Sequence, residues 1–396
     1  MTRALDGIKV LDLSRYVAGP YCAQMLGDFG ADVIKIEKPE GGDPMRGVGA
    51  ETGDDKLYMT LYNRNKRSLA LNLRHDKGRE ILGNLIRQAD VLVENFRPGT
   101  MEEMGFGWDE ASALNPGLVM ARISGFGQDG PWAKRPAFDA IAQAEGGLMH
   151  LTGSRDGEAT MMGAIMIDYS TGTNAALGVL AALHARERTG LGQVVDVPLL
   201  DTAMSFLMTA VAEYQRDGVV MGRLGNRDRY SAPTNTYRTR DGERLHLMAA
   251  GQKHFEALVA IMGEQKILDD PAFATAKDRL ENAEIVDETV AGWFARHDEA
   301  WLYEHLVAAE IPCARLATVA DVVENPQIKH RQQIIEVEHP TLGTVAMQGN
   351  PIRLTGTPVE TFRDVPTLGQ HTAEVLAEFL DLDTDAIAAL RREGVI

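Results

Sequence analysis

Residues 8–37, IKVLDLSRYVAGPYCAQMLGDFGADVIKIE, determine the fold of the first half of the chain. The runs at 8–13 and 32–37 have the composition of buried strands, and apolar residues recur at near-helical spacing in the segment 19–31 between them. A helix that joins two strands in this order forms a βαβ unit with parallel strands. The stretch therefore predicts a parallel sheet with a crossover helix.

The same alternation continues through the first two hundred residues. We expect an amphipathic helix at 75–89, buried strands at 90–96 and 118–127, and a further strand and helix within 193–214. The simplest arrangement of these elements is an α/β fold with a mostly parallel, doubly wound sheet.

The composition changes after this region. Residues 215–243 are rich in Gly, Arg, Asp and Asn, which predicts a linker or exposed loop. Residues 244–325 contain one strand and three helical segments, enough for a small α+β domain. A hairpin pattern and two helices end the chain, and pattern alone leaves open which domain these helices join.

The charge balance bears on the partners. The formal net charge is −17, from 40 basic and 57 acidic residues. Nucleic acids and anionic membranes bind basic faces, so this balance disfavours both as partners. Some basic residues still cluster, and they could hold the phosphates of a small ligand. They are Lys35, Lys38, Arg46, Arg64, Lys66, Arg67 and Arg74.

The cysteine content and the apolar runs indicate the compartment. Cys22 and Cys313 are far apart in the sequence, which makes a disulfide framework unlikely and excludes a CxxC site. The N-terminus lacks the pattern of a secretory signal, and no apolar run is long enough to span a membrane. We therefore expect a cytoplasmic protein.

Several cofactor and catalytic motifs are missing from the sequence. The first βα turn has one glycine where GxGxxG needs three, there is no GxxxxGK[ST], and no metal-ligand spacing accompanies the ten histidines. In ARISGFG, Arg122 and Phe126 occupy the places where a serine-hydrolase elbow needs glycine. We therefore expect no metal and no prosthetic group.

One acidic residue precedes a predicted helix that consists almost entirely of small and aliphatic residues. In MGAIMIDYSTGTNAALGVLAALHARERTG, residues 162–190, Asp168 precedes a run of small and aliphatic residues that ends in basic residues and glycine. At the first turn of a helix, the dipole favours an ionised carboxylate by about 0.3–1 kcal/mol. Asp is also a common N-cap, so capping is the alternative role. The small residues that follow predict room for a large ligand.

Several blocks of the chain, taken together, resemble the class III coenzyme A transferases, the CaiB/BaiF-type family that includes formyl-CoA transferase. The blocks extend from LDGIKVLDLSRYVAGPYCAQMLGDFGADVIKIEKPEGGDPMRG through YNRNKRSLALNL, ADVLVENFRPGTMEEMGFGW, FDAIAQAEGG and RTGLGQVVDVPLLDTA to TLGQHTAEVL. The resemblance implies that the chain is an acyl-CoA:carboxylate CoA-transferase. Asp168 stands in the place of the family's nucleophile, which forms a mixed anhydride and then an aspartyl-CoA thioester.

The resemblance also implies binding residues. Coenzyme A, as a substrate, is expected to contact Val17, Ala18, Lys38, Leu71, Arg74, Asn95, Phe96 and Arg97. Substrate contacts are expected at Tyr58, Asp139 and Gly251.

The identity of the acids that exchange CoA is less defined. Val48 replaces the tryptophan of the formyl-CoA enzymes, which disfavours oxalate and formate. Small dicarboxylates such as succinate are common in the family, and Arg15, Arg46 or Lys253 could recognise a distal carboxylate.

Two alternative functions remain at this point. An α-methylacyl-CoA racemase would have a histidine where this chain has Phe138, so proton abstraction lacks a partner. A CoA-binding protein without catalysis is the second alternative.

The resemblance implies an architecture as well. Residues 1–214 and 326–396 are expected to form a large Rossmann-like domain, and 244–325 a small α+β domain. Two protomers are expected to interlock as a homodimer.

Overall fold

The computed structural model describes residues 2–49, 51–52, 55–359 and 363–396. Contacts divide the chain into two compact units. Unit 1 consists of Met1–Leu148, Met161–Val211 and Gln327–Ile396, and unit 2 consists of Met149–Thr160 and Ala212–Pro326.

Unit 1 is built on a six-stranded sheet in the order β5-β2-β1-β6-β7-β8, with every neighbouring pair parallel. This confirms the predicted α/β class. The strand order reverses between β1 and β6, and such a reversal opens a crevice at the carboxyl ends of the strands. The strands are β1 (Lys9–Asp12), β2 (Asp32–Glu37), β5 (Lys66–Ala70), β6 (Val91–Glu94), β7 (Val119–Ser124) and β8 (Val194–Pro198).

Helices cover both faces of this sheet. Val10 and Val33 belong to a core shared with α1 (Ala18–Asp28) and α8 (Met166–Thr189). Leu11 belongs to a second core, on the other face, to which α3 (Asp76–Ile86), α17 (Thr372–Leu380) and α18 (Thr384–Arg392) contribute. Neighbouring strand residues therefore enter opposite cores, as expected for a parallel sheet buried on both faces.

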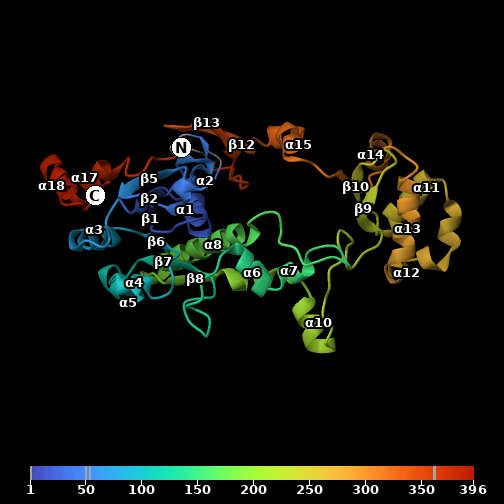
Figure 1. Ribbon diagram of the computed structural model, residues 1–396, viewed down its shortest axis with the longest axis horizontal. Coiled ribbons are helices and arrows are strands. Elements are labelled where there is room, and N and C mark those ends of the chain that lie inside the picture. The colour runs from blue at the N-terminus through green and yellow to red at the C-terminus, as the bar shows by residue number, and fades with distance from the viewer. Residues whose placement is uncertain (1, 50, 53–54, 360–362) are drawn as a thin grey trace. The chain divides into compact units, whose positions relative to one another are not determined.

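The C-terminal helices belong to unit 1. The Thr372 hydroxyl accepts a hydrogen bond from the Ala70 N–H at 3.0 Å, and the His371 N–H donates to the Ser68 carbonyl at 3.0 Å. Figure 1 shows the red helix α17 beside the blue strand β5. These contacts resolve which unit the terminal helices join.

The two helices on the first face approach each other closely at Gly172. A Cβ at this position would lie 2.6 Å from the Ala18 carbonyl oxygen and 3.3 Å from the Cys22 nitrogen. Ala175 and Ala176, one turn further along α8, are buried in the same core. The small residues of α8 therefore serve helix packing. The prediction that they leave room for a ligand is wrong at these positions, because the α1 backbone fills that space.

Unit 2 contains a three-stranded antiparallel sheet in the order β11-β10-β9. A core around Trp293 and Phe294 packs helices α11 (Gln252–Met262), α13 (Ala283–Phe294) and α14 (Glu299–Ala308) against it. The strands are β9 (Thr234–Arg238), β10 (Arg244–Met248) and β11 (Cys313–Arg315).

Strand β9 lies within residues 215–243, which the composition predicted as a linker. This edge strand, TNTYR, is mostly polar, but it buries Tyr237 in the core of unit 2. The composition of this segment therefore predicts a loop, whereas its pairing with β10 makes it a strand.

The described part of the chain contains further α-helices and strands. They are the helices α2 (Leu57–Leu61), α4 (Thr100–Glu103), α5 (Trp108–Leu114), α6 (Asp139–Glu145), α7 (Leu148–Leu151), α9 (Leu199–Ser205), α10 (Ala210–Asp217), α12 (Ala276–Glu281), α15 (Val319–Glu324) and α16 (Pro326–His330), and the strand pairs β3 (Glu51–Thr52) with β4 (Asp55–Lys56) and β12 (Ile334–His339) with β13 (Gly343–Gln348). Within the described ranges, none of the helices combines the length and apolar character needed to cross a bilayer.

The close approach at Gly172 predicts a steric effect of substitution. Gly172→Ala should lower the free energy of unfolding by about 1–3 kcal/mol, because the added methyl group meets backbone that cannot move aside. Gly83→Ala is the control in the same unit, since its Cβ would meet nothing nearer than Phe106 at 3.5 Å. The control should be neutral or stabilising by up to about 1 kcal/mol, from helix propensity. Urea unfolding measures both, and equal effects would contradict the packing argument.

Candidate active site

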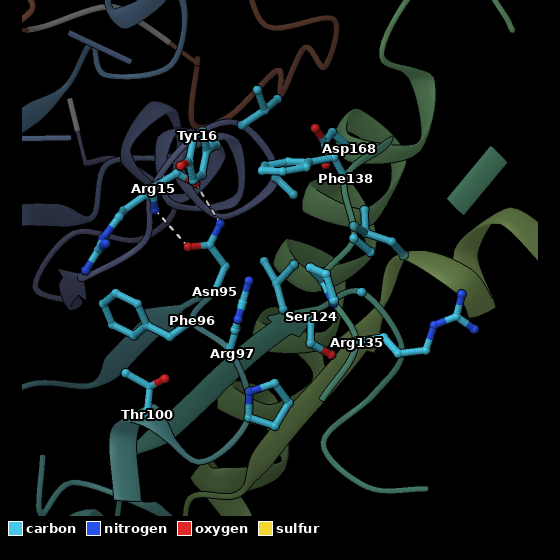
Figure 2. A pocket seen from close by; sticks show the side chains of 18 of the residues that line it. Arg15, Tyr16, Asn95, Phe96, Arg97, Thr100, Ser124, Arg135, Phe138 and Asp168 are labelled. Atoms are coloured by element: carbon cyan, nitrogen blue, oxygen red, sulfur yellow. Dashed lines mark hydrogen bonds between the residues drawn. The ribbon is translucent and has the colours of Figure 1, made fainter. Parts of the chain in front are cut away.

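The crevice at the strand-order reversal is a cavity of about 400 Å³. Its walls come from the loops after β1 and β6, the loop that joins β7 to α6, and the first turn of α8. Among the described residues, Asp168 is the one carboxylate in the lining, together with Arg15, Arg97 and Arg135. Figure 2 shows Asp168 beside Phe138, and Arg97 pointing between Phe96 and Ser124.

The turn after β1 is held to the loop after β6 by one amide side chain. The Asn95 Oδ1 accepts from the Arg15 N–H at 2.8 Å, and its Nδ2 donates to the Arg15 carbonyl at 2.6 Å. The Arg15 guanidinium lies over the Phe96 ring, 4.6 Å from its centroid. Tyr16 has a left-handed φ of 65°. Both loops therefore present a defined surface to the cavity.

Beneath this turn lies a buried ionic network. Lys66 Nζ donates to Asp12 Oδ2 at 2.8 Å, and Lys35 Nζ lies 3.0 Å from Asp43 Oδ2 and 3.0 Å from the Ser14 carbonyl. The lysine charges outweigh the burial of Asp12 and hold the pKa of its carboxyl below its usual range. Lys35 and Lys66 are therefore committed to holding the turn and cannot bind ligand phosphates.

The neighbouring arginines are committed in the same way. Arg46 makes a bidentate pair with Glu37, at 2.8 Å for both bonds, and Arg64 pairs with Asp28. Arg67 pairs with Asp32 and with two glutamates of α17. The prediction that the clustered basic residues hold phosphates is wrong for Arg46, Arg64 and Arg67, because acidic side chains close to them in space already occupy their guanidinium groups. For the same reason, the prediction that Arg46 recognises a distal carboxylate is wrong.

Asp168 is the third residue of α8 and lies in the first turn of the helix. The N-cap residue, Ile165, has no side chain that can cap the helix. The Asp139 carboxylate takes this role from α6, because its Oδ2 accepts from the Ile167 N–H at 2.7 Å and from the Asp168 N–H at 3.1 Å. Asp168 itself does not cap, and its carboxyl group lines the cavity.

The ionisation of Asp168 differs from the prediction. Burial, with a further contribution from the Asp139 charge, raises the pKa of Asp168 from 3.8 to about 7. The helix dipole was expected to favour the ionised form. Burial outweighs the dipole, and the first-turn N–H groups already bind a second carboxylate, Asp139.

The structure brings together six of the predicted site residues. Val17, Ala18, Asn95, Phe96, Arg97 and Asp168 line the cavity, and so does Arg15, which was a candidate for binding a distal carboxylate.

The remaining predicted residues of unit 1 lie outside the lining. Lys38 and Arg74 are exposed beyond the ends of β2 and β5, and Leu71 is buried in the hydrophobic core. Tyr58 packs on Tyr62, with ring centroids 5.8 Å apart. Asp139 faces the backbone of α8.

In unit 2, Gly251 is the N-cap residue of α11. Lys253 is exposed and lies 3.9 Å from Glu310.

Sequence reasoning missed several lining residues. Ser124 is the last residue of β7, and the rule that ligands bind at the carboxyl ends of strands could have identified it. Tyr16 and Phe138 meet edge to face, with centroids 5.4 Å apart, although 122 positions separate them in the sequence. Arg135 pairs with Glu145 at 2.7 Å. No local pattern marks these loop residues.

The comparisons with known proteins agree with this geometry. The family described as CoA-transferase family III matches residues 5–372. The succinyl-CoA–D-citramalate CoA-transferase of Chloroflexus aurantiacus is 39% identical over 395 residues, covering 100% of this chain and 98% of the relative. The formyl-CoA:oxalate CoA-transferase of Streptomyces avermitilis is 36% identical over 413 residues, covering 100% of both.

A solved structure has a similar fold. The crystal structure of a CAIB/BAIF family protein from Brucella suis superposes with a TM-score of 0.84 at 32% identity, covering 96% of this chain and 100% of that chain. The chain belongs to CoA-transferase family III, and it is a CoA-transferase.

The raised pKa of Asp168 predicts a pH-dependent gain in stability for Asp168→Asn. The folded state holds the proton more tightly than the unfolded chain, so the ionised carboxyl costs stability increasingly between pH 4 and pH 7. The variant should be more stable than wild type by about 4 kcal/mol at pH 8 and by less than about 2 kcal/mol at pH 5.

Urea unfolding at the two pH values measures this difference. Asp201→Asn, which changes an exposed acid in the first turn of α9, is the control and should show no such trend. A difference for Asp168→Asn that is the same at both pH values would contradict the electrostatic account.

Proposed function

We propose that this enzyme moves CoA from a donor acyl-CoA to an acceptor carboxylate, with Asp168 as the nucleophile. The observation that carries the proposal is a partly buried carboxylate with a raised pKa, placed in a cavity whose other charged residues are arginines. A desolvated carboxylate of this kind is more basic and therefore more nucleophilic than one in water.

In the first half of the cycle, an Asp168 oxygen attacks the thioester carbonyl. The C–S bond breaks, CoA leaves as the thiolate, and the acyl group forms a mixed anhydride with Asp168. The thiolate then attacks the aspartyl carbonyl, and the donor acid leaves as its carboxylate. The product of these two steps is an aspartyl-CoA thioester.

In the second half, the acceptor carboxylate attacks the aspartyl carbonyl and displaces the thiolate. The acceptor and Asp168 are then joined in a new anhydride. The thiolate attacks the acceptor carbonyl of that anhydride, releasing the new acyl-CoA and the free Asp168 carboxylate. Every nucleophile in the cycle is an anion, so no step requires a general base.

The cavity supports a binding mode for CoA. We propose that Arg15 and Arg97 meet the phosphates, because a guanidinium offers several donors to phosphate oxygens. Phe96, under the Arg15 guanidinium, offers an apolar face to the adenine. Val17 and Ala18 border the same cavity, where the thioester must approach Asp168.

We further propose a short dicarboxylyl-CoA, such as succinyl-CoA, as the donor. The relative from Chloroflexus aurantiacus carries succinyl-CoA in its name. The arginines of the lining offer a distal carboxylate charged partners. Phe138 lines the cavity with an apolar ring, so it offers no proton acceptor for a racemase reaction.

Covalent chemistry at Asp168 predicts an adduct that can be weighed. Wild-type enzyme incubated with succinyl-CoA and no acceptor should gain the mass of CoA less one water, and the modified peptide should contain Asp168. Asp168→Ala should show no adduct and should lose at least about 10³-fold in kcat, because the nucleophile is gone.

The matched control is again Asp201→Asn, which should form the adduct as wild type does. An adduct in Asp168→Ala at the wild-type level would contradict the assignment of the nucleophile.

A further inference from the structure

A buried pair of polar side chains on α6 lies directly behind Asp168. Asp139 opens the helix and is 4% exposed, and Gln143, one turn later, is 0% exposed. Neither residue lines the cavity. Their hydrogen bonds nevertheless extend to the backbone on which the reacting carboxyl group sits.

These hydrogen bonds form a chain in which each group can act only as donor or only as acceptor. Asp139 Oδ2 accepts from the N–H groups of Ile167 and Asp168, at 2.7 and 3.1 Å. Asp139 Oδ1 accepts from Gln143 Nε2, and Gln143 Oε1 accepts from the Met162 N–H at 3.0 Å. Because the backbone at both ends only donates, Asp139 must accept throughout, and the Gln143 amide cannot turn over.

This chain holds the segment before α8 and the first turn of α8 to the same helix. Side-chain oxygens usually cap the second or third N–H of their own helix. Here these two N–H groups belong to Ile167 and Asp168, and the cap comes from α6. The position of the Asp168 backbone is therefore set by a carboxylate outside its own helix.

We propose that Asp139 and Gln143 are positioning residues that fix the reacting carboxyl of Asp168 and keep a negative charge beside it. This inference rests on the proposed role of Asp168 as nucleophile. The charge keeps Asp168 more basic than a helix terminus would by itself, and the Gln143 amide holds the Asp139 carboxylate in place. The raised pKa of Asp168, to which Asp139 contributes, supports the proposal.

Among the described residues, few other charged or titratable groups face Asp168. Tyr62, which follows α2, interacts with it electrostatically, and Tyr169 is its neighbour on α8. Burial raises the pKa of both phenols, so they are neutral across the working range. Arg15, Arg97 and Arg135 line the same cavity. We therefore expect a substitution of Asp139 to change the pKa of Asp168 more than a substitution of any of these other residues.

The direction of the hydrogen bonds allows a swap that separates position from charge. In Asp139→Asn, the amide NH2 would face the Gln143 NH2, and turning Gln143 over would set two donors against each other at Met162. In the double variant Asp139→Asn/Gln143→Glu, the new amide at position 139 donates to the new carboxylate at position 143, and that carboxylate also accepts from the Met162 N–H. All donors and acceptors are then paired again, but the charge has moved one side chain further from Asp168.

The experiment measures kcat and the pH dependence of kcat/KM for wild type, Asp139→Asn, the double variant, and Asp201→Asn as the control. Wild type should show an acidic limb with a midpoint of about 7, where Asp168 ionises. Asp139→Asn should lose about 10²-fold in kcat, because misplacement of the reacting group by about 1 Å has that effect. The double variant should recover at least about tenfold of this loss, with its midpoint about 0.5–1 pH unit below wild type. Asp201→Asn should match wild type.

Two outcomes would overturn the proposal. If the double variant recovers activity with an unmoved midpoint, Asp139 and Gln143 are structural only. If the double variant is as inactive as Asp139→Asn although its thermal unfolding matches wild type, Asp139 acts in some way other than positioning. Formation of the aspartyl-CoA adduct by wild type reports on the proposed function separately, so either failure can be distinguished from a failure of the nucleophile assignment.

Discussion

The parallel pairing of β1 with β2 on one side and with β6 on the other is the constraint on which the site depends. Val10 pairs with Val33 and with Val91 in the two neighbouring strands. The connection that follows β1 leads to β2 on one side, and the connection that follows β6 leads to β7 on the other side. No crossover therefore covers the carboxyl ends of β1 and β6. The loops after these strands face each other there, and the first turn of α8 closes the same cavity.

A second constraint concerns charge. A helix N-terminus would normally lower the pKa of a carboxyl in its first turn. In this enzyme the available N–H groups bind Asp139, and burial raises the pKa of Asp168 to about 7. Near neutral pH about half of the Asp168 carboxyl groups are therefore ionised. The ionised fraction is poorly solvated, which suits the proposed attack on a thioester without help from a base.

Much of the fold was predictable because it depends on local periodicity. The run at 8–37 contains two strands and a helix with the correct period for each, and α8 ends at Thr189 with the expected glycine, Gly190, as its C-cap. Strand β9 was missed because its side chains are mostly polar. The place of the C-terminal helices depends on contacts such as Thr372 with Ala70, which no pattern in one segment contains.

The site was predictable only in part, for the same reason. Asp168 could be found, since a family resemblance and a helix start coincide there. The basic residues Lys35 and Lys66 suggested a phosphate site, but their pairing with Asp43, eight positions away, and with Asp12, 54 positions away, becomes visible only in three dimensions. The contact between Asp139 and the Asp168 N–H, and the Asp139 charge that adds to the effect of burial on the pKa of Asp168, likewise leave no trace in local sequence.

The central claim is that an oxygen atom of Asp168 takes part in the bond-making steps. A single turnover tests it most directly, with enzyme in excess over succinyl-CoA and an acceptor acid labelled with ¹⁸O in both carboxyl oxygens, followed by mass analysis of the peptide that contains Asp168. The acceptor leaves one of its oxygens on the aspartate when the second anhydride is resolved, so the peptide should gain one ¹⁸O, and other acidic peptides should gain none. Full turnover with an unlabelled Asp168 peptide would contradict the account.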